Sequence, residues 1–387
     1  MGQPLGPVAD RERRIFSLLE RACGSAFPGC VALVWDDGAE RYHEAHGVLA
    51  DHPQSPACGR LARRGSIYDL ASLTKPLAAG VLAGIALSEG RVALDDPVPA
   101  DLAPGLPGAT FGHLLCHGAG LAAHEPLYAG LSGVDPAAAR ARLSKTRPLA
   151  PPGTRVLYSD LGFLFLGDWI ERLFDRPLID LFEDRVAGPL GLAEPTSERF
   201  VGYLPVGRAV DPRVLARIAP TERYTDRPDE APPADYLALR AAVATEARGE
   251  VHDDNAYVLG GVAGHAGLFG TAAGVADLAR ALLDGRVPGL RAEVRDRLWR
   301  PCGIGGSRRR FAFDVPTEGG STGGALDPDA VGHLGFTGTS FWIEPRRRRI
   351  YVLLSNRVYP WRDRAEAIAA VRRAFHRIAA GDEADST

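Results

Sequence analysis

The sequence predicts an α+β fold, in which helices flank an antiparallel sheet and a long, mostly helical segment interrupts the sheet-forming chain. Strand patterns followed by turns occur near the N-terminus, at Cys30–Trp35 and Glu40–Val48. They return near the C-terminus, at Phe341–Glu344 and Ile350–Leu354, where a charged turn separates two apolar runs. Between these two groups of strands, loops rich in proline and glycine alternate with helical patterns.

Amphipathic helices are expected at both ends of the chain and between the strand groups. Apolar residues at helical spacing mark Arg11–Cys23 near the start and Ala365–Ala379 near the end. A further helix should follow Ser72 and end near Gly90. The remaining helical patterns are Ala137–Leu143, Leu161–Leu173 and Ala272–Leu283.

This order of elements predicts two domains. If the terminal helices pack on one sheet built from both ends of the chain, residues 1–93 and 265–387 form a discontinuous α/β domain. Residues 94–264 then form a mostly helical domain inserted into it. Clefts between domains are common sites of binding and catalysis, so we expect the active site at this junction.

The bulk composition is that of a soluble globular protein, with 45% apolar and 24% charged residues. A formal net charge of −3 gives no reason to expect a nucleic-acid or acidic-membrane partner. The first residues lack the basic and apolar regions of a signal peptide. No uninterrupted apolar run reaches the roughly 18 residues of a membrane span. We therefore expect a cytoplasmic protein without a membrane partner, and the sequence leaves its oligomeric state open.

Neither a metal nor another cofactor is expected. Five scattered cysteines form no C-x-x-C pair, which argues against a zinc ribbon or a thioredoxin-type motif. His252, Asp253 and His265 could be imagined as metal ligands. Such residues in loops more often make turns and hydrogen bonds, so their role stays open. The sequence contains no Walker or H-E-x-x-H motif, and its G-x-S-x-G match at residues 319–323 lies in a glycine-rich run without a following strand, so it does not read as a nucleophile elbow.

Ser72 and Lys75 form an S-x-x-K pair at the start of the expected helix. A spacing of three places both side chains on one helix face, within reach of each other. A serine hydroxyl becomes a good nucleophile when a neighbour takes its proton, and a lysine made neutral by burial could do so. Of the 45 basic residues only Lys75 and Lys145 are lysines, which hints that arginine cannot replace Lys75.

Two further motifs follow in the chain and turn a weak signal into a specific one. Tyr158 and Asp160 precede a helical pattern, where the phenol can relay a proton to a leaving group. His333, Gly335 and Phe336 lead into the strand pattern at residues 340–344, where small residues let a substrate approach the backbone. A backbone N–H there, with that of the nucleophile, could form an oxyanion hole.

The order of these three motifs resembles the serine β-lactamase and penicillin-binding-protein superfamily, and most of all its class C β-lactamase-like branch. The resemblance extends from about Pro28 to Asn356. It implies a β-lactamase/DD-peptidase-like fold in which Ser72 is acylated, Lys75 activates it and Tyr158 is the second acid/base. It also implies that Asp160, His333 and Gly335 contact substrate and that the Phe336 N–H completes the oxyanion hole.

Three positions depart from the pattern of this superfamily. Asp160 replaces an asparagine, and His333 and Leu334 replace a lysine and a hydroxyl residue. The resemblance implies that the replaced lysine and hydroxyl hold a substrate carboxylate. These departures favour an ester or amide of a small molecule over a β-lactam.

The leading hypothesis is therefore a serine hydrolase that cleaves a small ester or amide through an acyl-enzyme on Ser72. A true class C β-lactamase or a D-alanyl carboxypeptidase is the alternative within the same superfamily. A catalytically silent β-lactamase fold that only binds a ligand is the alternative from another class. The presence of Ser72, Lys75 and Tyr158 together argues against a silent fold.

Overall fold

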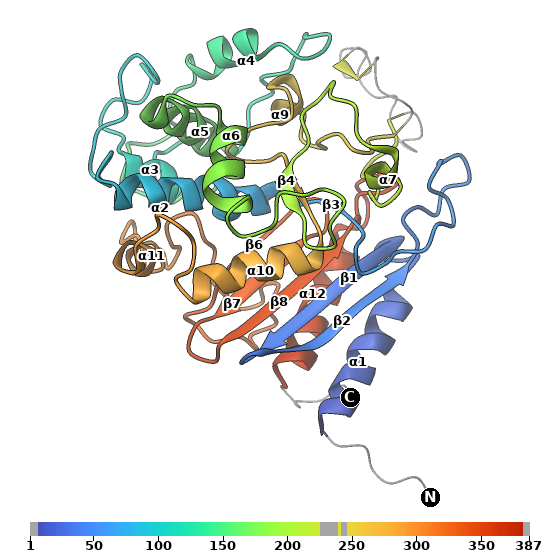
Figure 1. Cartoon of the computed structure of the whole chain (residues 1–387). Coiled ribbons are helices and arrows are strands. Elements are labelled where there is room, and N and C mark those ends of the chain that lie inside the picture. Colours follow the sequence, from blue (N-terminus) through green and yellow to red (C-terminus); the bar gives the residue numbers. More distant parts are fainter. Residues whose placement is uncertain (1–6, 225–238, 241–245, 382–387) are drawn as a thin grey trace, which may run out of the picture.

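A five-stranded antiparallel sheet lies at the centre of the lower half of the molecule (Figure 1). The computed structural model describes residues 7–224, 239–240 and 246–381. The strand order is β2–β1–β8–β7–β6, and β1 pairs with β8 so that Cys30 lies opposite Ser355. The sheet is thus built from both ends of the chain, as predicted. Its strands are β1 (Gly29–Asp36), β2 (Ala39–Gly47), β6 (Val331–Leu334), β7 (Ser340–Glu344) and β8 (Arg349–Ser355).

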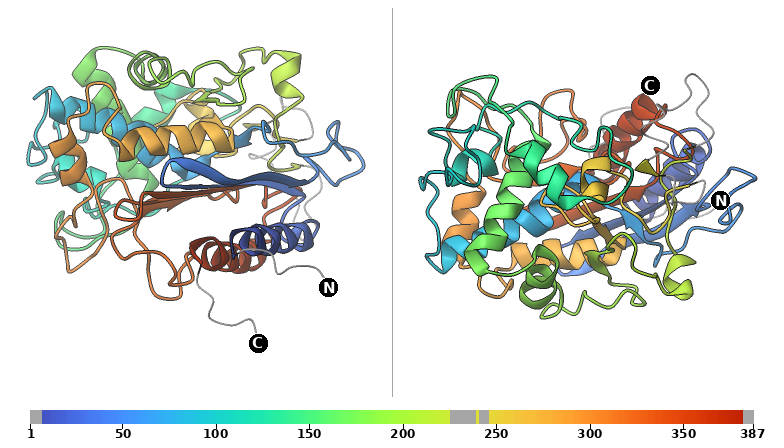
Figure 2. Two further views of the ribbon diagram at one scale, coloured as in Figure 1. Left: turned by 60° about the horizontal axis from the view of Figure 1, so that its bottom comes forward. Right: turned by 90° about the horizontal axis from the view of Figure 1, so that it is seen from above.

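Helices cover both faces of this sheet (Figure 2). The terminal helices α1 (Pro7–Ala22) and α12 (Ala365–Ala380) lie side by side on one face, and α10 (Ala272–Leu283) lies on the other. The side chains of β1 alternate between the two apolar clusters: Ala32 and Val34 belong to the cluster that contains α1 and α12, whereas their neighbours belong to the larger cluster. Burial on both faces explains why β1 reads as a continuous apolar run.

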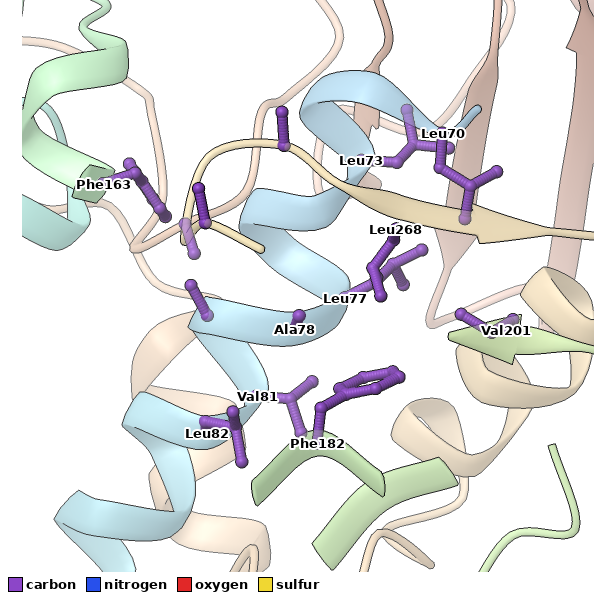
Figure 3. Packing of buried hydrophobic residues seen from close by; sticks show 14 of the residues in the cluster. Leu70, Leu73, Leu77, Ala78, Val81, Leu82, Phe163, Phe182, Val201 and Leu268 are labelled. Atoms are coloured by element: carbon purple, nitrogen blue, oxygen red, sulfur yellow. The ribbon is translucent and has the colours of Figure 1, made fainter. Parts of the chain in front are cut away.

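The helix that follows the S-x-x-K motif is buried in the larger core. It begins as a 3₁₀ turn (Ala71–Leu73), continues as a π-helical segment (Lys75–Gly80) and ends as α2 (Val81–Ser88). Leu77 packs among apolar side chains from neighbouring elements (Figure 3). The run Ala71–Ser88 is long and apolar enough to cross a membrane, but 83% of it is buried inside the protein, which is the environment of a core helix.

The chain between the two groups of strands is mostly helical in the part that the structure describes, and it lies above the sheet (Figure 1). A small second sheet joins three short strands in the order β3–β5–β4. The strand β4 lies inside the predicted insertion, whereas β3 and β5 lie outside it. The hydrogen bonds between β4 and β5 therefore link the two predicted domains, whose boundaries remain a prediction. The elements are β3 (Tyr68–Asp69), α3 (Phe111–Leu115), α4 (Pro136–Leu143), α5 (Asp160–Phe174), α6 (Leu178–Phe182), a π-helical turn (Glu183–Ala187), β4 (Val201–Tyr203), α7 (Pro212–Leu215), α9 (Asp254–Val258), β5 (Leu268–Gly270) and α11 (Ala292–Leu298).

Candidate active site

Ser72 lies within hydrogen-bond distance of two titratable side chains. Lys75 Nζ lies 2.8 Å from Ser72 Oγ, and the Tyr158 hydroxyl donates to the same oxygen at 2.9 Å. Ser72 belongs to the 3₁₀ turn and Lys75 begins the next helical segment, so both come from one stretch of chain. Tyr158 comes from the loop before α5. The structure therefore brings together the three residues that the sequence predicts to be catalytic.

The turn that carries Ser72 is held in an unusual backbone conformation. Ala71 has φ +47°, which residues with a side chain seldom adopt and which is often found at functional sites. The buried carboxylate of Asp69 accepts hydrogen bonds from the N–H of Ala71 at 2.8 Å and from that of His252 at 2.7 Å. These bonds fix the backbone immediately before Ser72.

Lys75 is fully buried, and its surroundings favour the protonated form. Its Nζ contacts Asp160 Oδ1 at 2.7 Å and the carbonyl oxygen of His265 at 3.3 Å, in addition to Ser72. Burial alone would lower the pKa of Lys75, but the nearby Asp160 and Tyr158 outweigh it and raise the pKa above its usual value. This direction is opposite to the one that the expected neutral lysine requires, because Asp160 supplies a negative charge next to Lys75.

Asp160 is not the N-cap of α5. Ser159 is the N-cap, and its hydroxyl accepts from the Gly162 N–H. Asp160 is the first helical residue, which leaves its carboxylate free to reach Lys75. Tyr158 is 37% exposed, with His117 packed against its ring at 4.6 Å between ring centroids.

Two threonines connect the segment that contains His333, Gly335 and Phe336 to the turn that carries Ser72. His333 lies on β6, and the residues from Gly335 to Thr339 form the turn between β6 and β7. Thr337 Oγ1 donates to the carbonyl of Asp69 at 2.7 Å, and Thr339 Oγ1 donates to that of Leu70 at 3.1 Å. A Cβ at Gly335 would lie 2.0 Å from Thr339 Oγ1, so only glycine fits this close approach.

These elements surround a cleft of about 650 Å³. Lys75 lies beneath the cleft, while the other predicted site residues line it. The role of the Phe336 N–H as an oxyanion donor remains a prediction. The predicted residues on the cleft wall are Ser72, Tyr158, Asp160, His333, Gly335 and Phe336.

The histidines that could have been metal ligands make structural pairs. His252 Nε2 lies 2.8 Å from Glu222 Oε2, and His265 Nε2 lies 2.8 Å from Asp253 Oδ1. In the described part of the chain, no group of three or more His, Cys, Asp or Glu side chains is arranged to hold a metal ion. His265 contributes its backbone carbonyl to Lys75, so its contact with the catalytic centre is indirect.

Several arginines that the sequence did not single out also line the cleft. The Arg309 guanidinium lies 5.3 Å from the centroid of the Tyr158 ring and pairs with Asp314 at 3.2 Å. Arg357 and Arg362 lie beside the exposed ring of Phe336. Nearly every cation in this chain is an arginine, so no local pattern could have distinguished these three from surface charges.

Comparison with known proteins places this geometry in a family. A family model described as "Beta-lactamase" matches residues 16–375. The chain is 28% identical over 362 residues to a "Putative D-alanyl-D-alanine carboxypeptidase" of Escherichia coli O157:H7, covering 86% of this chain and 79% of the relative. It is 27% identical over 378 residues to an "N-acetylmuramyl-L-alanine amidase" of Bacillus subtilis, covering 89% and 80%.

Solved structures show the same fold. A class C β-lactamase superposes with a TM-score of 0.68 at 16% identity, covering 96% of this chain and 99% of the other. This confirms the β-lactamase/DD-peptidase-like fold that the motifs implied. The match of the family model over nearly the whole length, with the three motifs assembled around one cleft, shows that the chain belongs to the Beta-lactamase family.

Proposed function

We propose that this protein is a serine hydrolase that cleaves an ester or amide bond of a small molecule through an acyl-enzyme on Ser72. One observation carries the proposal: Ser72 Oγ lies within hydrogen-bond distance of both Lys75 and Tyr158. A binding protein has no need for a serine held between these two groups at the wall of a cleft.

The geometry indicates a role for each of these residues in the reaction. The raised pKa of Lys75 favours its protonated form, so we assign uptake of the Ser72 proton to the Tyr158 oxygen after that hydroxyl has given up its own proton. Ser72 Oγ then bonds to the substrate carbonyl carbon. Tyr158 returns the proton to the departing alcohol or amine, which leaves an acyl-enzyme. Water activated by the same oxygen hydrolyses this intermediate and regenerates Ser72.

A rapid-mixing experiment with p-nitrophenyl acetate tests the proposal. The wild type should release a burst of p-nitrophenol equal to the concentration of active sites whenever deacylation is the slower step. Ser72→Ala should show neither a burst nor turnover. Turnover by the variant at the wild-type rate would show that Ser72 is not the nucleophile.

The kind of bond cleaved is decided by a substrate panel. The names of the two relatives, a carboxypeptidase and an amidase, favour an amide, whereas the replacements at His333 and Leu334 favour a substrate without a bound carboxylate. Rates with p-nitrophenyl acetate, nitrocefin and a D-alanyl dipeptide separate esterase, β-lactamase and peptidase. We propose that ester or simple amide turnover exceeds that of nitrocefin, and a higher kcat/KM for nitrocefin would favour the β-lactamase alternative.

A cytoplasmic location remains a proposal. Fractionation of the source cells, with an antibody against this chain, tests it. Recovery in the soluble fraction together with a cytoplasmic marker supports the proposal, and release with an extracytoplasmic marker contradicts it.

A further inference from the structure

One wall of the cleft contains a buried nitrogen that has no partner in the part of the chain that the structure describes. His333 is only 3% exposed, and its ring lines the cleft next to Tyr158, with 5.9 Å between the ring centroids. Its Nε2 makes no hydrogen bond to any residue that the structure describes. Buried polar atoms in native proteins are nearly always paired. Because the ring of His333 lines the cleft, a ligand bound there is a source of the missing hydrogen-bond partner.

The other ring nitrogen of His333 fixes what Nε2 can do. Nδ1 lies 2.7 Å from the carbonyl oxygen of Leu334. A carbonyl oxygen only accepts hydrogen bonds, so Nδ1 carries the ring proton. In the neutral ring Nε2 then has a lone pair and no hydrogen. It can accept a hydrogen bond but cannot donate one.

The surroundings keep this ring neutral. Burial, together with the positive charges of Lys75 and Arg309, holds the pKa of His333 well below its usual value. A neutral imidazole offers no charge to a carboxylate. The neutral His333 therefore lacks the positive charge of the lysine that it replaces.

The position of His333 identifies the part of the substrate that would meet it. Tyr158 contacts Ser72 Oγ and, in the proposed reaction, gives its proton to the leaving group. The leaving group must therefore lie against Tyr158, whose ring is a neighbour of the His333 ring. Leu334, which replaces a hydroxyl residue, lines the same cleft and adds only apolar surface.

Arg309, a cation that lines the same cleft, is already paired with an acid. Arg309 lies 3.2 Å from a carboxylate oxygen of Asp314, and both residues line the cleft. An incoming carboxylate would meet Asp314 as well as Arg309, so the pair offers little net positive charge.

We propose that His333 selects leaving groups that carry a neutral hydrogen-bond donor, a hydroxyl or an amide N–H, over leaving groups that carry a carboxylate. The proposal rests on the proposed function, because it names the substrate class of the same acyl-transfer site. It predicts that the natural leaving group is a neutral hydroxylated alcohol or an amide-bearing amine.

Three butyrate esters with one acyl group and different leaving groups test it on the wild-type protein. The 2-hydroxyethyl ester offers a donor, the propyl ester replaces the hydroxyl with a methyl of similar size, and the carboxymethyl ester offers a carboxylate. Acid release is followed by titration at constant pH. We expect kcat/KM for the 2-hydroxyethyl ester to exceed that of the propyl ester roughly tenfold or more, because the propyl ester leaves a buried acceptor unpaired. The carboxymethyl ester should be the poorest substrate.

Equal rates with the 2-hydroxyethyl and propyl esters would overturn the proposal. So would a preference for the carboxymethyl ester, which would instead identify Arg309 as a carboxylate anchor. Turnover of p-nitrophenyl butyrate separates this failure from failure of the proposed function. If that activated ester acylates Ser72 but the 2-hydroxyethyl ester is not preferred over the propyl ester, only the proposed leaving-group selectivity is wrong. If no ester acylates Ser72, both proposals are wrong.

Two substitutions locate the preference at His333. His333→Gln keeps an acceptor and should retain most of the preference for the 2-hydroxyethyl ester over the propyl ester. His333→Leu removes the acceptor and should bring the ratio of the two rates close to one. The readout is a ratio within each variant, so a general loss of activity does not affect it. A wild-type ratio in His333→Leu would contradict the assignment.

Discussion

At the scale of single residues, Asp160 determines how the catalytic centre is charged. Its carboxylate lies 2.7 Å from the buried Lys75 Nζ and, with Tyr158, outweighs the effect of burial on the pKa of that lysine. The sequence identified both residues as site residues, but it could not reveal their pairing. That contact depends on how α5 packs against the segment that follows Ser72, which is a tertiary property.

Replacing Asp160 tests this electrostatic role. Asp160→Asn removes the negative charge that favours the protonated Lys75, so the protonated centre becomes less stable. We expect the acid limb of the pH profile of kcat/KM to shift to lower pH, because the proton leaves the Lys75–Tyr158 pair more readily. Profiles measured with p-nitrophenyl acetate provide the check.

The matched control is Asp160→Glu, which keeps the charge. It should leave the acid limb closer to its wild-type position than Asp160→Asn does, even where the lengthened side chain lowers the rate. An acid limb that stays in place in Asp160→Asn would show that this carboxylate does not control the reacting proton.

At the scale of elements, the site depends on how the turn between β6 and β7 is attached to the turn that carries Ser72. Thr337 and Thr339 make the attachment by donating to backbone carbonyls of Asp69 and Leu70. The predicted oxyanion donors, on Ser72 and Phe336, come from these two turns. Their relative position should therefore be sensitive to either threonine.

Thr337→Val removes one of these hydrogen bonds while preserving the shape of the side chain. The free energy of unfolding should fall by roughly 1 kcal/mol, the typical net value of a buried hydrogen bond. The rate constant kcat should fall more than KM changes, because the oxyanion develops only in the transition state. Urea unfolding and steady-state kinetics measure the two effects.

Thr154→Val is the control for this substitution. The Thr154 hydroxyl also donates to a backbone carbonyl, that of Pro151 at 2.7 Å, but on the exposed surface. It should change neither stability nor kcat appreciably. Equal kinetic effects of the two substitutions would argue against a specific role for the attachment.

Local sequence patterns predicted helices and strands well where a single apolar periodicity dominated. The strand β1 and the helix α10 were expected because apolar residues recur with the period of each structure, and α10 has the predicted bounds. The 3₁₀ and π-helical geometry around Ser72 was not expected, since a regular helix has the same apolar pattern. The positive φ of Ala71 was not expected either, because the residues before it are held by hydrogen bonds from the β6–β7 turn, which is distant in the sequence.

At the scale of the whole molecule, buried histidines couple stability to pH. His376 in α12 is buried, with Nδ1 2.9 Å from the carbonyl oxygen of Ser321. Burial lowers the pKa of His376 from 6.5 to about 4. The unfolded chain therefore binds a proton below pH 6.5 that the folded chain resists until pH 4, and stability is lost as the pH falls through this window.

The predicted loss from His376 alone is about 3 kcal/mol between pH 7 and pH 4. His117 and His333, whose pKa values are also lowered by burial, should add to it in the same direction. Urea unfolding at several pH values measures the dependence. His376→Gln cannot titrate and should show a shallower decline, whereas an unchanged decline would exclude His376 as a source.

The central claim is that Ser72 becomes covalently acylated by substrate-like electrophiles. Intact-mass spectrometry after incubation with a fluorophosphonate tests it most directly. We predict a single adduct on the wild type, located on the peptide that contains Ser72, and no adduct on Ser72→Ala. An adduct that persists in Ser72→Ala, or a wild type that reacts neither with the fluorophosphonate nor with a penicillin, would contradict the account.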